Sequence, residues 1–103
     1  MYIQLAPFKL KAGVDEQTLF RASDDFEKNF VQKQKGIIKR IFLKNTDGSY
    51  ADLVFFESKE DADRVLQAEQ TSPEFFSLME MDETTPNMGV LSFDHIKTYE
   101  KQN

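Results

Sequence analysis

The chain has 103 residues, a length that suits one folded domain and is too short for two independent cores. Its formal net charge of −5 repels phosphate backbones and anionic lipid surfaces, which argues against nucleic acid and membranes as partners. Because the sequence contains no cysteine, disulfides, thiolate zinc sites and a cysteine nucleophile are excluded.

The N-terminal segment predicts a strand followed by a helix. Residues 3–11 are largely apolar and end at Ala12-Gly13, which is typical of a strand that enters a turn. This segment has no basic leader and no long apolar core, so we expect neither a signal peptide nor a membrane span, and a cytoplasmic protein. Asp15 is placed to cap a helix whose apolar residues recur every three or four positions until Gly36.

The middle of the chain predicts a β-hairpin. Segments 37–44 and 50–57 are rich in β-branched and aromatic residues, and an Asp-Gly pair lies between them. A turn centred on that pair would place Arg40 opposite Phe55. Both faces of the hairpin are then apolar, one with Ile37, Ile41, Leu43, Val54 and Phe56, the other with Ile38, Phe42, Leu53 and Phe55.

Two apolar faces require two covering layers. The helices of one chain can cover only one face of the sheet, and 103 residues leave nothing to cover the other. A second copy of the chain is the simplest cover, so we expect a homodimer that packs sheet against sheet.

The C-terminal half predicts a capped helix over residues 58–69 and then a shorter apolar helix over 72–81, which begins at Ser72-Pro73. Residues 88–99 predict the last strand. The whole chain, residues 1–103, therefore reads as one α+β domain of the ferredoxin-like βαββαβ type, with a four-stranded antiparallel sheet.

Several segments resemble the antibiotic biosynthesis monooxygenase-like family, and the resemblance spans nearly the whole chain. It is carried by residues 36–40, 47–58, 60–62 and 93–96. The resemblance implies a dimeric α/β barrel that holds an aromatic or haem-like ligand between sheet and helices. The family includes cofactor-independent monooxygenases, so the resemblance implies no cofactor. Haem-degrading relatives carry a Trp and a His on the second helix, whereas this chain has no Trp and its single His lies in the last strand.

Residues 48–62 also resemble the third strand and second helix of an RNA-recognition domain. That module needs a basic residue before the strand and exposed aromatic residues for base stacking. Asp47 and Asp52 stand at those places, and both repel phosphate. We therefore expect no RNA binding.

His95 and Arg40 are the candidate catalytic residues. A free imidazole titrates nearest to neutral pH, which suits proton transfer, although a structural or rim position explains His95 better. Arg40 and Glu57 are expected as diagonal neighbours that orient a polar ligand or form a rim salt bridge. The start of the third strand, including Asp52, is expected at a solvated edge. With one His and scattered carboxylates, no metal site is expected.

A cavity is predicted between the sheet and residues 75–81, closed by aromatic and methionine side chains that can instead be plain core. The predicted lining residues are Phe55, Glu57, Phe75, Phe76 and Met79.

Two functions follow from these predictions. One is a cofactor-free monooxygenase, in which a water-excluding cavity and a His or Arg stabilise a substrate anion that reacts with oxygen. The other is a non-catalytic dimer that binds a small apolar or aromatic ligand, or that only assembles. Convergence of His95 and Arg40 on an enclosed space of a few hundred cubic ångströms would favour the enzyme.

Overall fold

The computed structural model describes residues 1–80 and 89–102. The helices and strands follow the βαββαβ order that the sequence predicts. In chain order they are β1 (Tyr2–Leu10), α1 (Glu16–Asn29), η1 (Val31–Lys33), β2 (Ile37–Lys44), β3 (Tyr50–Phe56), α2 (Lys59–Ala68), η2 (Glu69–Thr71), η3 (Phe76–Leu78), β4 (Met79–Glu80) and β5 (Leu91–Asp94), where η marks a 3₁₀ helix.

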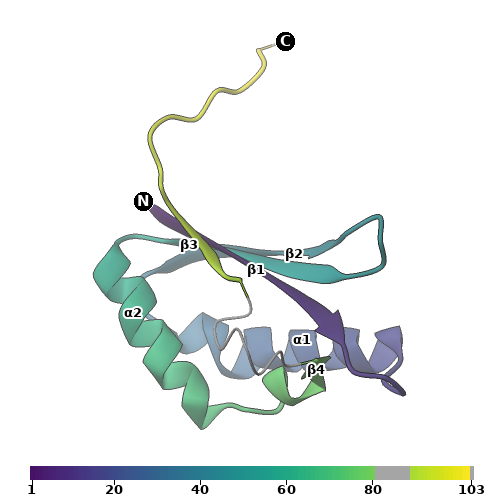
Figure 1. Cartoon of the computed structure of the whole chain (residues 1–103). Helices are drawn as coiled ribbons and strands as arrows, with labels where there is room; N and C mark the ends of the chain where they lie inside the picture. Colours follow the sequence, from purple (N-terminus) through teal and green to yellow (C-terminus); the bar gives the residue numbers. More distant parts are fainter. Residues whose placement is uncertain (81–88, 103) are drawn as a thin grey trace.

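The strands form one antiparallel sheet in the order β2-β3-β1, and β1 carries two short strands on its other side. β5 pairs with the first half of β1, and β4 pairs with its last two residues. Both α-helices lie against the same face of this sheet, and the opposite face is open (Figure 1). This is the predicted ferredoxin-like α+β arrangement.

The predicted helix starts are confirmed by their caps. The Asp15 carboxylate accepts the N–H of Thr18 at 2.8 Å, and the Ser58 hydroxyl accepts the N–H of Asp61 at 3.2 Å. These side chains satisfy backbone donors that have no partner inside the helix. The first helix ends earlier than predicted, at Asn29, and a 3₁₀ turn leads from it towards β2.

The prediction of a helix over residues 72–81 is wrong. A single 3₁₀ turn forms there, and β4 then pairs with Lys9 and Leu10 at the end of β1. The N–H of Lys11 also donates to the carbonyl of Leu78 at 3.0 Å. Pairing with β1 thus replaces a continued helix, because it satisfies backbone groups at an open sheet edge. Residues 81–88 lie outside the described part. Of the predicted strand over residues 88–99, only β5 forms as a strand among the described residues.

The hairpin between β2 and β3 has a different register from the predicted one. Its loop comprises residues 45–49, so that Lys44 pairs with Tyr50. Gly48 closes this loop with a φ of +90°, which glycine adopts without a steric penalty. The prediction of a two-residue turn centred on Asp47-Gly48 is therefore wrong by one position.

A slip of one position moves the side chains of one strand to the other face relative to its partner. Ile41 pairs with Leu53, and Lys39 pairs with Phe55, so these residues lie on the open face of the sheet. The predicted face compositions are therefore wrong, although the open face is indeed apolar. This face is made by Ile3, Leu5, Ile41, Leu43, Leu53, Phe55, Leu91 and Phe93.

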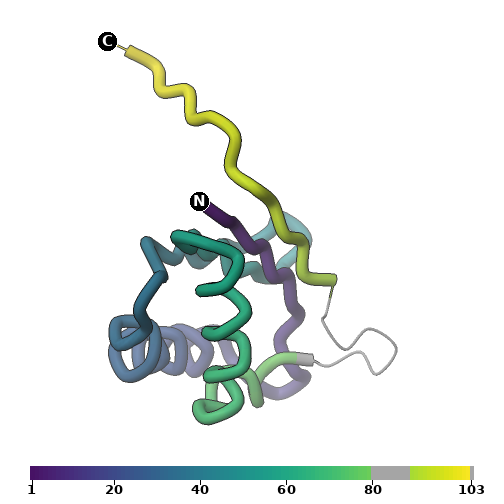
Figure 2. The backbone as a smooth tube through the Cα atoms, turned by 90° about the vertical axis from the view of Figure 1, so that its left-hand side faces the viewer, coloured from purple at the N-terminus to yellow at the C-terminus, as the bar shows by residue number. Residues whose placement is uncertain are grey.

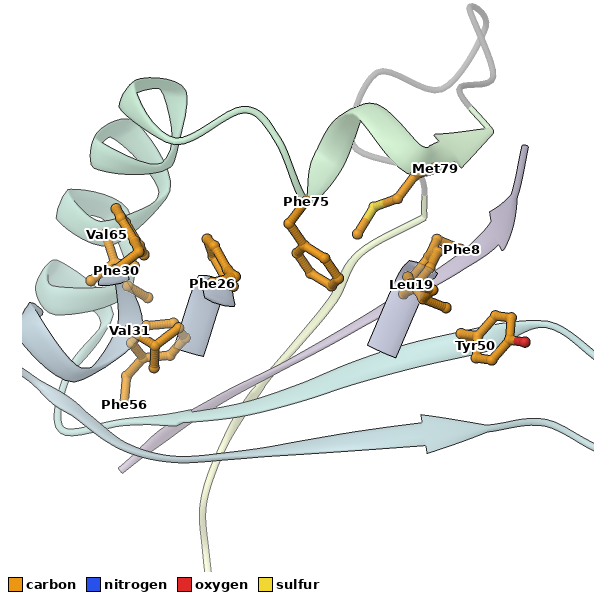
Figure 3. Packing of buried hydrophobic residues seen from close by; sticks show 11 residues of the cluster. Phe8, Leu19, Phe26, Phe30, Val31, Tyr50, Phe56, Val65, Phe75 and Met79 are labelled. Carbon is orange, nitrogen blue, oxygen red and sulfur yellow. The ribbon is translucent and has the colours of Figure 1, made fainter. Parts of the chain in front are cut away.

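The core lies between the sheet and the two helices. Phe26 of α1 stacks on Phe75 at a ring-centroid distance of 5.0 Å, and Phe75 is among the most deeply buried side chains of the described residues. Figure 3 shows both rings in the space above the strands, with Val65 of α2 and Phe8 of β1 on either side. The segment that follows α2 therefore contributes to the same core as the helices.

The open face and the C-terminal segment share one side of the molecule. On the open face, Leu91 keeps 51% and Phe93 keeps 47% of its surface exposed. After β5 the chain runs away from the sheet on the side opposite the helices, as Figures 1 and 2 show. Within the described residues, none of the helices has the length and apolar character needed to cross a membrane.

Candidate functional site

A charged cluster lies in the layer between the sheet and the helices. Arg40 of β2 donates from Nε to Oδ1 of Asp52 on β3 at 3.0 Å, and from Nη2 to the hydroxyl of Ser23 on α1 at 2.8 Å. The side chains of Arg40 and Asp52 are only 6% and 11% exposed. Such a buried pair needs these hydrogen bonds, because both charges have lost most of their water.

Aromatic rings surround the guanidinium group. Its central carbon lies 5.3 Å from the ring centroid of Phe26, 5.5 Å from that of Phe42 and 5.1 Å from that of Phe75. At these distances a cation is attracted to the electron-rich ring faces. The cluster is therefore a polar centre inside an aromatic interior.

Three carboxylates face this single cation. Besides Asp52, Glu27 of α1 approaches Nη1 of Arg40 at 3.4 Å. Glu69, at the end of α2, is the third. Burial, together with the negative charge of Asp52, raises the pKa of Glu69 to about 7, against the opposing charge of Arg40. Burial also raises the pKa of Asp52, and the Arg40 guanidinium opposes that shift.

The true hairpin register explains why Arg40 meets Asp52. Arg40 is directly opposite Val54, so Asp52 is its diagonal neighbour on the same face of the sheet. The predicted partner, Glu57, lies beyond the end of β3 with an exposed side chain. The predicted Arg40–Glu57 pair is therefore wrong, and so is the expectation that Asp52 lies at a solvated edge.

A half-open groove of about 290 Å³ lies between α1 and the segment after α2. Phe26 and Phe75 form part of its wall, and the same two rings pack on Arg40. The groove also reaches Ser72, whose N–H donates to the carbonyl of Glu69 at 3.0 Å. The remaining lining residues are Thr18, Arg21, Ala22, Asp25, Asn29 and Glu74.

The predicted lining residues separate into two groups. Phe75, Phe76 and Met79 pack together in the core on the helix side of the sheet. Phe55 lies on the open face instead, where the Lys39 ammonium is 4.6 Å from its ring centroid. The structure therefore does not bring Phe55 into one space with Phe76 and Met79.

His95 does not meet Arg40. Two strands, β3 and β1, separate β2 from β5, and His95 follows β5. Its N–H donates to the carbonyl of Met1 at 3.0 Å, and its Nε2 lies 2.6 Å from the hydroxyl of Thr98. The convergence of His95 and Arg40 that would favour the enzyme is therefore absent from the described residues.

Comparison with solved structures identifies the fold. A monooxygenase from the gene ActVA-Orf6 of Streptomyces coelicolor, solved with the ligand nanaomycin D, matches 98% of this chain and 92% of its own, with a TM-score of 0.69 and 14% identity. SnoaB, a cofactor-independent oxygenase from Streptomyces nogalater, matches 94% of both chains, with a TM-score of 0.64 and 14% identity. This chain has the antibiotic biosynthesis monooxygenase fold.

A plant protein shares the same fold. At3g17210 from Arabidopsis thaliana matches 99% of this chain and 100% of its own, with a TM-score of 0.69 and 14% identity. No protein-family model matches the sequence, and no curated protein matches it. At these identities the likeness concerns the fold, so the site must be judged from its own residues.

Sequence reasoning identified Arg40 and Phe75 but missed Ser23, Asp52 and Glu69. The correct hairpin register would have placed Asp52 beside Arg40, whereas Ser23 and Glu69 lie on helices and carry no local signal. Within residues 1–80 and 89–102, no three His, Asp or Glu side chains are arranged to hold a metal ion. What the cluster offers chemically is a buried cation, a carboxylate that titrates near neutral pH and a wall of aromatic rings.

Proposed function

We propose that this protein is a homodimer that binds a small aromatic ligand, and that it acts on this ligand as a cofactor-independent monooxygenase. The observation that carries the proposal is the Arg40–Asp52 pair inside the aromatic layer, beside a groove of about 290 Å³. Ring faces bind a planar apolar ligand, and a few polar groups fix its orientation.

In the proposed reaction the ligand itself reacts with oxygen. An electron-rich phenol that loses its hydroxyl proton becomes an anion able to react with oxygen without metal or flavin. The charge of Arg40, which packs on the two rings that form part of the groove wall, would stabilise that anion. The likeness in fold to SnoaB and to the Streptomyces coelicolor monooxygenase supports this class of reaction.

The dimer part of the proposal rests on the open face of the sheet. Its apolar side chains run across four strands, those of β2 and β5 exposed and those of β1 and β3 half-buried, and such a surface is unusual for a monomer in water. Ile96 and Tyr99, in the segment that projects on the same side, are also exposed. A second copy packed on this face would cover both.

The test combines binding and oxygen uptake. Naphthalene diols are added to the purified protein without metal or flavin, and we measure the melting temperature and the dissolved oxygen. A ligand that raises the melting temperature binds the native state. We expect both a rise in melting temperature and oxygen consumption with at least one diol, and no oxygen consumption with naphthalene itself, because it has no hydroxyl proton to lose. Absence of any thermal shift across the series would contradict the ligand site.

A non-catalytic ligand-binding dimer is the second candidate. The separation of His95 from Arg40 favours it, because the described residues place no histidine beside the aromatic wall. Binding of the diols without oxygen consumption would select this alternative.

A further inference from the structure

The groove between α1 and the segment after α2 has an apolar floor. Ala22, Phe26 and Phe75 line it, and all three belong to the core or pack against it. Ala22 carries only a methyl group, so α1 leaves space at a position that a larger side chain would fill. The volume of about 290 Å³ is at the lower end of the range that holds small ligands, which suits a ligand of one or two rings with a short substituent.

Three charged residues surround this floor. Arg21 and Asp25 line the groove from α1, and Glu74 lines it from the segment after α2. Arg21 is followed four positions later by Asp25 and eight positions later by Asn29, so the three lie on one face of the helix. Because side chains enclose the backbone of a helix, it is the side chains of these residues that line the groove.

These three charges are not neutralised by the protein itself. Within residues 1–80 and 89–102, the side chains of Arg21, Asp25 and Glu74 form no ion pair and no hydrogen bond. The other two arginines differ, because Arg40 and Arg64 each pair with an aspartate. Arg21 and Asp25 have the spacing of a helical ion pair, yet they do not form one. The guanidinium and both carboxylates are therefore available to a ligand.

We propose that the groove binds an aromatic α-amino acid in its zwitterionic form. The carboxylates of Asp25 and Glu74 hold the ammonium group, Arg21 binds the carboxylate, and the aromatic ring lies on the apolar floor. The inference rests on the ligand site proposed above and names the class of ligand for it. Where the ring carries a hydroxyl group, such a ligand is also the phenol that the proposed reaction needs.

The charges of the groove select this class. A guanidinium binds a carboxylate through two parallel hydrogen bonds, and hydrogen bonds between charged groups are stronger than those between neutral ones. An uncharged ligand leaves all three charged groups without a partner. A ligand with a single charge uses only one sign and faces repulsion from the other, whereas a zwitterion satisfies both.

The test uses three soluble probes that share one phenyl ring and one chain length. Phenylalanine carries both charges, phenethylamine lacks the carboxylate, and 3-phenylpropionate lacks the ammonium group. Each is titrated into ¹⁵N-labelled protein, and the NMR shifts of the backbone amides give both the dissociation constant and the place of binding. Naphthoresorcinol, one of the naphthalene diols named above, is titrated as the uncharged reference.

We expect phenylalanine to shift the amide signals of α1 between Thr18 and Asn29. It should bind roughly tenfold more tightly than either probe with one charge, because each of those loses a charge-assisted contact. Signals that shift only outside α1 and the segment after α2 would place the amino acid elsewhere and overturn the inference.

Substitutions should remove the two preferences separately. Arg21→Gln should bind phenylalanine and phenethylamine with equal dissociation constants. Asp25→Asn combined with Glu74→Gln should bind phenylalanine and 3-phenylpropionate equally. Arg64→Gln is the matched control, because this arginine pairs within α2 and does not line the groove, and it should keep the preferences of the wild type. All the changed side chains are exposed, and the amide spectrum of each variant shows that it is folded.

The possible failures can be told apart. Equal dissociation constants for the three phenyl probes, or binding of naphthoresorcinol without binding of phenylalanine, would overturn the recognition of a zwitterion and leave the ligand site intact. Absence of binding by all four compounds would overturn the proposed ligand site and this inference with it.

Discussion

At the scale of single residues, Arg40 is the centre of the buried charged cluster. Its side chain donates hydrogen bonds to Asp52 and Ser23 and packs on aromatic rings. It therefore stabilises the core and also supplies the positive charge of the cluster. Removing one partner of a buried ion pair leaves the other charge without compensation.

We therefore expect Arg40→Met to lower the free energy of unfolding by about 3–5 kcal/mol, because Asp52 stays buried without its cation. The double variant Arg40→Met, Asp52→Leu should recover much of that loss. Urea denaturation measures both. Lys44→Met is the matched control, since it breaks an exposed salt bridge of the same strand and should change little. Equal losses in the single and double variants would contradict the compensated pair.

Glu69 makes stability depend on pH. Its pKa is raised from 4.5 to about 7 in the folded state, so the folded protein binds this proton more tightly than the unfolded chain. The resulting stability is fully present below the unfolded pKa and is lost as the pH rises through the folded one. We expect Glu69→Gln to remove a decline of roughly 2–3 kcal/mol across this window.

Unfolding free energies at closely spaced pH values check this prediction. Glu60→Gln should keep the slope of the wild type, because that side chain is exposed. A wild-type slope that survives in Glu69→Gln would assign the proton to another group.

At the scale of elements, the segment after α2 is the least predictable part of the described chain and the one that closes the groove. It was expected as a helix, yet only one 3₁₀ turn forms before β4 joins β1. Its two neighbouring phenylalanines differ in depth, since Phe75 is 1% exposed and Phe76 is partly buried.

This difference in depth predicts different outcomes for the two alanine variants. Phe75→Ala should lower the free energy of unfolding by about 3–5 kcal/mol, the cost of a cavity at a fully buried ring. Phe76→Ala should cost less, because that ring is only partly buried, and it should leave binding of an aromatic ligand nearly unchanged, because Phe76 does not line the groove. Thermal unfolding with and without naphthoresorcinol separates the two effects. Phe20→Ala, at an exposed position on α1, is the control. Equal effects of Phe75→Ala and Phe20→Ala on stability would contradict the packing of this segment.

At the scale of the whole molecule, the apolar side chains of the open sheet face are the reason to expect a second copy of the chain. The proposed dimer should have twice the chain mass of 12.0 kDa in light scattering. Leu91→Glu puts a charge on the open face and should give monomers, because a buried unpaired carboxylate opposes association. Leu66→Glu changes a leucine of similar exposure on α2 and should keep the dimer. Dissociation by Leu66→Glu alone would place the interface on the helices.

The local chemistry of the sequence determined the elements and their order. Caps at Asp15 and Ser58 and the two segments of the hairpin were recognisable from a few neighbouring residues, since such signals act over one turn or one strand. The order of these elements indicated the fold class, and the apolar character of the open face was equally visible.

The tertiary structure alone decided which side chains meet. The hairpin has a loop of five residues where the sequence predicts a two-residue turn. This register makes Asp52, and not Glu57, the neighbour of Arg40, and the charged cluster depends on it. Strand order kept His95 away from it, and α2 supplied Glu69. The physical reason is that side-chain direction alternates along a strand, so one step of register decides the face, and that burial of a carboxylate depends on segments far away in the chain.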